Sequence, residues 1–391
     1  MNEVFETDEK IYNLLGYLEC GLVLGKNLYL PNIKRGNINT LVLAGPGAGK
    51  SASYCIPNIM QKLGSYITID PDGEIYDMTN AYLRRNGYEV ILIDVKDMQN
   101  TYNYNPLSHI NTDKDIELLI NNIIKNENDE FWLQTSKCLL RCVIKYVLEK
   151  EETKDLLQCF NVLSNSREVF FNKIQNCANE NILNNFNVLK VLPEKTYQSI
   201  VSTVMAKLSF IINIQNKNRT YNYQVDFKEL SKRKIAFFIK IDDDCKEYNK
   251  IAEIFISQSF SQIEKGSENI YYLLDEINLL DRIGDFAQIM KSARRKGASI
   301  SVIIDSINKI KSIYGEDFET IIGNCDTQMF LGSNLLSDIE YFAQMLDVDK
   351  NTVRELDGDS LLVYERGLKP IKAQKMYFFN NETWIKEIEG V

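Results

Sequence analysis

The chain has 391 residues, of which 45% are hydrophobic and 25% are charged. These fractions are close to average globular usage, so the composition excludes disordered and fibrous classes, and at about 150 residues per domain the length predicts two or three domains. The formal net charge of −9 excludes a uniformly basic coat, so any contact with nucleic acid must use a local basic patch.

The cysteine and histidine content narrows the class of protein further. Eight cysteines contain no Cys-x-x-Cys pair, which favours a reducing cytosol over a secreted disulfide framework. The single histidine, His109, excludes His-centred hydrolases and most zinc sites. No signal peptide follows Met1, and no run approaches the ~20 apolar residues of a spanning helix. We therefore expect that the chain, as given, does not cross a membrane.

Near the N-terminus, short β-rich runs alternate with segments of helical spacing. The β-rich runs are NTLVLAG, SYITID and YEVILID, at 39–45, 65–70 and 88–94. Helical spacing covers 50–63 and 72–88. This alternation predicts βαβ units and a parallel sheet, which binds its ligands outside the carboxyl ends of the strands.

Further along the chain the pattern becomes helical and then returns to strands. Residues 113–225 have helical spacing, and FWLQTSKCLLRCVIKYVLEK is the clearest case. Strand-like runs follow at 234–242, 269–276, 297–306 and 327–333. The simplest architecture is an α/β nucleotide-binding domain with a parallel-rich sheet, interrupted by an all-α domain. Its predicted parts are residues 1–112, the all-α domain 113–225, and residues 226–391.

The strongest chemical signal is AGPGAGKS, Ala44 to Ser51, directly after a strand and before a helix. It fits a relaxed Walker A phosphate-binding loop, in which small residues let backbone N–H groups wrap a phosphate. Lys50 would hold the β- and γ-phosphates and Ser51 would ligate Mg²⁺; the alternative is a plain glycine turn. The predicted nucleotide-binding residues are Gly45, Pro46, Gly47, Ala48, Gly49, Lys50, Ser51 and Ala52.

Two carboxylates follow the buried strand YYLL, at Asp275 and Glu276. The carboxyl end of a parallel strand is where the phosphates would lie. Asp275 would hold Mg²⁺, and Glu276 would orient and deprotonate the attacking water. The alternative is a strand that ends in a solvated acidic turn.

Basic residues gather at 294–296, just before the next strand. A solvated basic helix end is the common explanation, because cations favour helix C-termini. The sharper hypothesis is that one arginine reaches the γ-phosphate of a neighbouring subunit. Phe131 and Trp132 are predicted to anchor the core of the all-α domain.

Several segments carry a family resemblance, in the family's order and across about residues 34–347. They are NTLVLAGPGAGKSASYCIPNIMQ, SYITIDPDGEIYDMT, YNYNPLSHI, NDEFWLQTSKCLLRCVIKYV, YYLLDEINLL, SIYGEDFETIIGNCDTQMFLGSN and DIEYFAQMLD. Together they resemble the TraG/TraD-type coupling proteins of type IV secretion and conjugation, especially the Gram-positive members.

The resemblance implies a RecA-like P-loop NTPase domain with an inserted all-α domain, working as a ring of six. Family members couple ATP hydrolysis to delivering DNA and its attached relaxase into a secretion channel. By position, Lys50 and Ser51 are the P-loop pair, Asp275 and Glu276 the Walker B pair, and Arg294 the arginine that acts across the subunit interface. ATP and Mg²⁺ are the implied ligands, and a cytoplasmic location at the inner face of the membrane is expected.

Three departures from the family pattern stand out. The usual pair of membrane-spanning helices is not present, so we expect either an anchor that is missing from this chain or a partner that docks it. Asp305 stands where the family has a glutamine that senses the γ-phosphate. Asp72 stands where it has a lysine, and both carboxylates put the hydrolysis rate in doubt.

The leading hypothesis is a DNA-translocating ATPase that recruits relaxase-bound DNA, hydrolyses ATP slowly as a monomer, and binds DNA through phosphates without sequence preference. The rival is a nucleotide-binding, non-hydrolysing substrate receptor, which Asp305 and Asp72 favour. A third alternative is a motor that moves protein without DNA.

Overall fold

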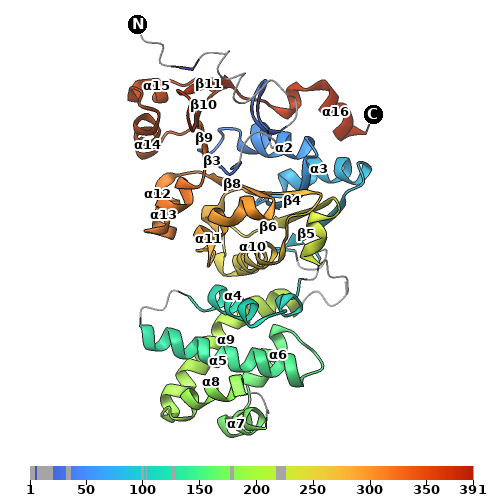
Figure 1. Cartoon of the computed structure of the whole chain (residues 1–391), viewed down its shortest axis with the longest axis vertical. Coiled ribbons are helices and arrows are strands. Elements are labelled where there is room, and N and C mark those ends of the chain that lie inside the picture. The colour runs from blue at the N-terminus through green and yellow to red at the C-terminus, as the bar shows by residue number, and fades with distance from the viewer. Residues whose placement is uncertain are drawn as a thin grey trace.

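A nine-stranded sheet forms the centre of the upper body in Figure 1, and a group of helices forms the lower body. The computed structural model describes residues 5–6, 21–31, 37–97, 101–102, 104–125, 129–176, 180–216 and 226–390. The strand order is β11-β10-β9-β3-β8-β7-β4-β6-β5. The seven strands from β9 to β5 are parallel, and β10 and β11 extend the sheet antiparallel.

The strands of this sheet include every β-rich run that the sequence predicts. A separate hairpin, β1 with β2, and the antiparallel pair β10 and β11 were not expected. The strands are β1 (Leu22–Gly25), β2 (Leu28–Leu30), β3 (Thr40–Ala44), β4 (Gly64–Ile69), β5 (Glu89–Asp94), β6 (Ile235–Lys240), β7 (Asn269–Leu274), β8 (Ala298–Ile304), β9 (Thr327–Gly332), β10 (Ser360–Glu365) and β11 (Ile371–Gln374).

Helices cover the sheet and form the lower body. They are α2 (Ile56–Met60), α3 (Glu74–Arg85), α4 (Asp113–Ile123), α5 (Glu130–Lys150), α6 (Leu156–Leu163), α7 (Arg167–Gln175), α8 (Glu180–Lys190), α9 (Glu194–Asn216), α10 (Lys250–Gln262), α11 (Phe286–Ser292), α12 (Ile307–Tyr314), α13 (Asp317–Gly323), α14 (Leu336–Leu346), α15 (Lys350–Arg354) and α16 (Glu382–Glu389).

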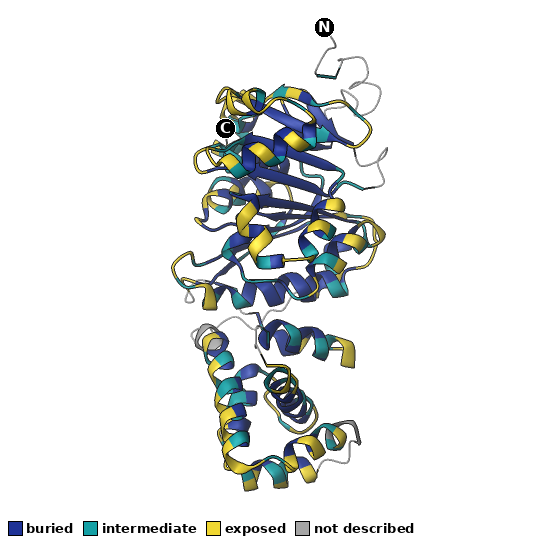
Figure 2. Cartoon of the chain, turned by 90° about the vertical axis from the view of Figure 1, so that its left-hand side faces the viewer, coloured by how far each residue is buried: buried dark blue, intermediate teal, exposed yellow. Residues whose placement is uncertain are grey.

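The sheet is buried on both faces, as Figure 2 shows by the dark strands between the helices. In β3, Leu41 and Leu43 pack into the hydrophobic cluster on one face, and Val42 and Ala44 pack into the cluster on the other. Near-continuous apolar runs are typical of parallel strands covered on both sides. The α/β class predicted from the sequence is confirmed.

The described residues from 113 to 216 contain helices and no strand. Their helix starts follow capping rules: Asp129, Asp155 and Ser166 each accept a backbone N–H in the first turn. Phe131 was predicted to anchor this core, but it is half-exposed in the first turn of α5, so that prediction is wrong. Trp132 beside it is partly buried.

Six cysteines are described and all are free thiols; Cys20 and Cys177 lie outside the described residues. In the part of the chain that the structure describes, no helix combines the length and the apolarity needed to span a membrane.

Candidate functional site

The glycine-rich loop connects β3 to the helical turn η1 (Ser51–Cys55). The N–H of Gly45 donates to the carbonyl of Gly332 at the end of β9, at 2.8 Å. Gly47 and Gly49 have φ angles of 73° and 84°. Glycine adopts this left-handed backbone without steric cost. Alternating left- and right-handed residues let successive N–H groups converge on an anion, so this loop has the backbone that phosphate binding requires.

The helix after the loop begins with a single π-helical turn, η1, and continues as α2. The helical spacing over 50–63 predicted a helix here, and the structure ends it at Met60; the π-helical turn within it was not predicted. Tyr54 fixes this turn on the sheet, because its hydroxyl lies 2.7 Å from Oγ1 of Thr40 and 2.8 Å from Oγ of Ser301. Insertions of this kind are frequent at functional sites.

Lys50 and Glu276 form an ion pair that joins the glycine-rich loop to the end of β7. Although burial lowers the pKa of Lys50, the charges of Asp275 and Glu276 hold that pKa above its ordinary value. Glu276 has a φ of 48°, a left-handed conformation that is uncommon for a non-glycine residue. Such strain is often found at functional sites. The structure therefore brings together three residues that the sequence predicted to act together.

Asp275 lies directly after β7 and is only 3% exposed. Its Oδ1 has no hydrogen-bond partner among the described residues. Burial raises the pKa of Asp275 to about 7, against the lowering effect of Lys50 and with a further rise from Glu276. A buried carboxylate oxygen without a partner is costly unless a cation or a ligand completes it.

Lys50, Asp275 and Glu276 line a cavity of about 250 Å³. The glycine-rich loop and the following turn contribute Gly47, Gly49, Lys50, Ser51 and Ala52; Gly45, Pro46 and Ala48 of the predicted set do not line it. Because Ser51 and Asp275 line the same cavity and both offer hard oxygen ligands, the residues fit Mg²⁺.

Another part of the wall of this cavity is acidic, since Asp70, Asp72 and Glu74 line it. Asp70 was not predicted as a site residue. Its carboxylate accepts the N–H groups of Ile75 and Tyr76 at 3.3 and 2.7 Å, which fixes the start of α3. Burial raises the pKa of Asp70 to about 6, and those two hydrogen bonds oppose the rise. The position of Asp70 after strand β4 was the signal that could have identified it.

Arg294 does not line the cavity of its own chain. It lies in the short helical turn η6 (Ala293–Lys296), where its side chain is exposed. The neighbouring Lys296 is structural, because its Nζ donates to the carbonyls of residues 260, 261 and 263 at 2.7, 2.7 and 3.0 Å. Within one chain, the predicted charge of Arg294 is therefore not part of this cavity.

Asp305 lies directly after β8 and pairs with Lys309, with 2.5 Å between Oδ2 and Nζ. It does not line the cavity, whereas Asp72 does and is exposed there. Of the two unusual carboxylates, Asp72 therefore contributes more directly to the field at the site. Lys309 supplies a counter-charge for Asp305 that was not predicted from the sequence.

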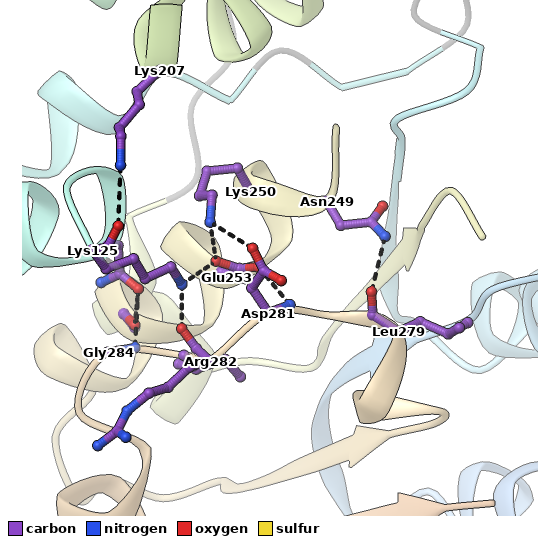
Figure 3. Close-up of polar contacts among 12 residues, drawn as sticks. Lys125, Lys207, Asn249, Lys250, Glu253, Leu279, Asp281, Arg282 and Gly284 are labelled. Carbon is purple, nitrogen blue, oxygen red and sulfur yellow. Dashed lines mark hydrogen bonds and ion pairs between the residues drawn. The ribbon is translucent and has the colours of Figure 1, made fainter. Parts of the chain in front are cut away.

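The segment after Glu276 is held by a buried ionic cluster, drawn in Figure 3. Oε1 of Glu253 accepts the N–H of Asp281 at 2.9 Å, and its Oε2 pairs with Lys125 and Lys250 at 2.6 and 3.0 Å. Lys125 also donates to the carbonyl of Arg282. Glu253 is fully buried, so this cluster fixes the loop that follows Asp275, the predicted metal ligand, and Glu276, the predicted catalytic base.

The same cluster connects to the all-α part of the chain. Nζ of Lys207, on α9, donates to the carbonyl of Lys125 at 3.0 Å, and Figure 3 shows this contact above the cluster. Burial lowers the pKa of Lys125 to about 8, and Glu253 opposes that change. A continuous set of hydrogen bonds therefore runs from the loop after Glu276 to α9.

Comparison with known proteins places the chain in a family. Residues 21–347 match the family model described as "Type IV secretory system Conjugative DNA transfer". Over 312 residues the chain is 18% identical to the type IV secretion system-coupling protein VirD4 of Bartonella quintana (strain Toulouse), covering 73% of this chain. It spans 49% of that relative's length.

Solved structures show the same fold. The coupling protein TrwB in complex with the ATP analogue ADPNP has a TM-score of 0.75 at 12% identity, covering 95% of this chain and 93% of that one. TrwBdeltaN70 with sulphate has the same TM-score at 14% identity, covering 95% and 93%. VirB4 of Thermoanaerobacter pseudethanolicus has a TM-score of 0.59 at 16% identity, covering 94% and 98%. The fold is therefore the RecA-like P-loop NTPase fold, and the chain belongs to the conjugative DNA-transfer family of the type IV secretory system, as its motifs predicted.

Proposed function

We propose that this coupling protein binds Mg²⁺-ATP in the cavity between the glycine-rich loop and β7 and hydrolyses it. The observation that carries the proposal is the convergence of Lys50, Asp275 and Glu276 on one cavity. TrwB, which shares the fold, has been solved with ADPNP and with ADP and Mg²⁺. Those complexes support a nucleotide at the corresponding position here.

In the proposed reaction, Lys50 exchanges its pair with Glu276 for the β- and γ-phosphates. Glu276 then becomes free to take a proton from water as the water oxygen bonds to the γ-phosphorus and the bond to the ADP oxygen breaks. Ser51 and Asp275 would hold Mg²⁺, which supplies charge neutralisation at the phosphates. Arg294 from a neighbouring subunit would add charge stabilisation in a ring of six.

We further propose that turnover drives relaxase-bound DNA into the secretion channel at the cytoplasmic face of the membrane. The helices within 113–225 would form a domain that receives the substrate, flanked by the two parts of the nucleotide-binding domain, 1–112 and 226–391. The hydrogen bonds from the loop after Glu276 to α9 support communication between these parts. DNA contact would be mainly to phosphates and weaken with salt.

The test is turnover of Mg²⁺-ATP by the wild type at high protein concentration, with Glu276→Gln as the background. Release of phosphate above that background is expected. Equal rates in the two proteins, with nucleotide binding confirmed, would contradict hydrolysis.

A second candidate function is a nucleotide-binding substrate receptor that does not hydrolyse ATP. The acidic wall of the cavity favours it, because Asp72 adds a negative charge beside the phosphates. Under this alternative, Asp72→Lys would create turnover where the wild type has none. Turnover in the wild type would exclude it.

A further inference from the structure

The C-terminal segment lies against the glycine-rich loop, although more than 300 residues separate the two in sequence. Lys375, which is 6% exposed, donates from Nζ to the carbonyls of Ala48 at 3.0 Å and Gly358 at 2.7 Å. A Cβ added to Gly49 would lie 3.1 Å from the ring of Tyr377. The segment after β11 is therefore fixed directly beside the phosphate-binding loop.

This segment presents a pair of stacked aromatic rings. The ring centroids of Tyr377 and Phe379 are 5.0 Å apart and the rings are inclined by only 17°. The Tyr377 hydroxyl donates to the carbonyl of Gly358 at 3.4 Å, which limits the orientation of the ring. Phe379 remains 50% exposed in the turn η7 (Phe378–Asn380). A rigid, partly exposed aromatic platform of this kind is what a flat, π-rich ligand stacks on.

A second cavity, of about 410 Å³, adjoins this platform. Tyr377 and Lys375 line it together with Asp359, Gln374 and Asn380, whose side chains offer hydrogen-bond donors and acceptors. Its volume lies within the roughly 300–1,000 Å³ typical of small-molecule sites. Gly49 lines the first cavity and Tyr377 lines the second, so the two cavities approach each other where these residues are in contact.

We infer that Tyr377 and Phe379 form the site for the base of the bound nucleotide. Tyr377 stacks on the base, Phe379 supports the opposite face of the tyrosine ring, and Asp359 and Gln374 face the polar edge of the base. Stacking accepts either purine, because every base has a π-face. This inference rests on the proposed function, since it requires phosphates in the first cavity.

The experiment compares two ligands that differ in having a base: Mg²⁺-ADPNP and Mg²⁺-tripolyphosphate, each titrated by calorimetry. Tyr377→Ala is expected to weaken ADPNP binding by about 5- to 150-fold, the range for loss of one base–aromatic stack. The affinity for tripolyphosphate stays unchanged, which also reports that the phosphate-binding loop remains folded. Tyr377→Phe keeps the ring and retains ADPNP binding.

Phe131→Ala is the matched control, because Phe131 is also 50% exposed but lies in the first turn of α5. It leaves the affinities for both ligands unchanged. Equal loss of both ligands in Tyr377→Ala would mean that the ring only supports the loop, and unchanged ADPNP binding would mean that the base binds elsewhere; either result overturns the inference. Failure of the wild type to bind either ligand would instead refute the proposed function on which it rests.

Discussion

Lys50 is paired with Glu276, so the lysine of the glycine-rich loop and the predicted catalytic base neutralise each other within the cavity. The two side chains come from opposite parts of the chain and are joined by the parallel order β3-β8-β7. A triphosphate that binds to Lys50 must compete with Glu276. Binding of the nucleotide to Lys50 and release of Glu276, the predicted catalytic base, are therefore expected to occur together.

This competition predicts opposite effects of Glu276→Gln on binding and on turnover. Removal of the carboxylate frees Lys50, so Mg²⁺-ADPNP should bind about 2- to 5-fold more tightly, the value of a partly exposed ion pair. Loss of the base should lower turnover by about 10²- to 10⁴-fold. Calorimetry and phosphate release measure the two effects. Weaker binding in this variant would show that the pair does not compete with nucleotide.

Asp275 predicts a dependence of stability on pH. Its pKa is raised to about 7, so the folded protein binds a proton more readily than the unfolded chain. Its contribution to stability is therefore present at low pH and is lost as pH rises from about 4 through 7. Asp275→Asn should remove the cost of ionising this buried carboxyl and raise Tm at pH 8 in EDTA by about 1 °C for each ~1 kcal/mol recovered.

The same titration predicts tighter Mg²⁺-dependent nucleotide binding as pH rises from 6 to 8, because Asp275 must be ionised to hold the cation. Asp275→Asn should bind weakly at every pH. A wild-type affinity that does not change over this interval would contradict the role of Asp275 as a metal ligand.

The ionic cluster predicts a large stability effect far from the nucleotide. Glu253→Gln leaves Lys125 and Lys250 without a buried counter-charge, at a cost of about 3–5 kcal/mol. Urea denaturation at pH 7 measures the loss. The exposed pair of Glu340 with Lys350, 2.6 Å apart, is the matched control, and Glu340→Gln should cost about 0.5 kcal/mol or less. Similar costs for the two variants would show that the cluster does not stabilise the loop.

The exposed position of Arg294 predicts that it acts only in an assembly. Arg294→Ala should leave Tm and ADPNP affinity of the single chain unchanged and lower turnover at high protein concentration on the order of 10³-fold. Arg295→Ala is the control, because that neighbouring side chain is exposed too. If Arg295 is the residue whose loss stops turnover, the positional match to the family is shifted by one.

Much of the sheet could be predicted because parallel strands covered on both faces are continuous apolar runs, as in β3 and β8. Strands β1, β2 and β11 were missed because runs of three or four residues lack that signal. Strand β10, SLLVYE, carries the signal over six residues and could have been predicted. Within the site, Lys50, Asp275 and Glu276 follow local spacing rules. Tyr377 could not be predicted as a site residue, because only the folded sheet brings the C-terminal segment to Gly49. Lys309, the partner of Asp305, could not be predicted either, because a single lysine four residues away is not distinctive.

Coupling of nucleotide turnover to DNA is tested by measuring Mg²⁺-ATP turnover with and without single-stranded DNA at several salt concentrations. We expect DNA to raise the rate, salt to reduce this stimulation, and Glu276→Gln to abolish turnover under both conditions. Turnover that is the same with and without bound DNA would contradict coupling, and would favour a motor that moves protein alone.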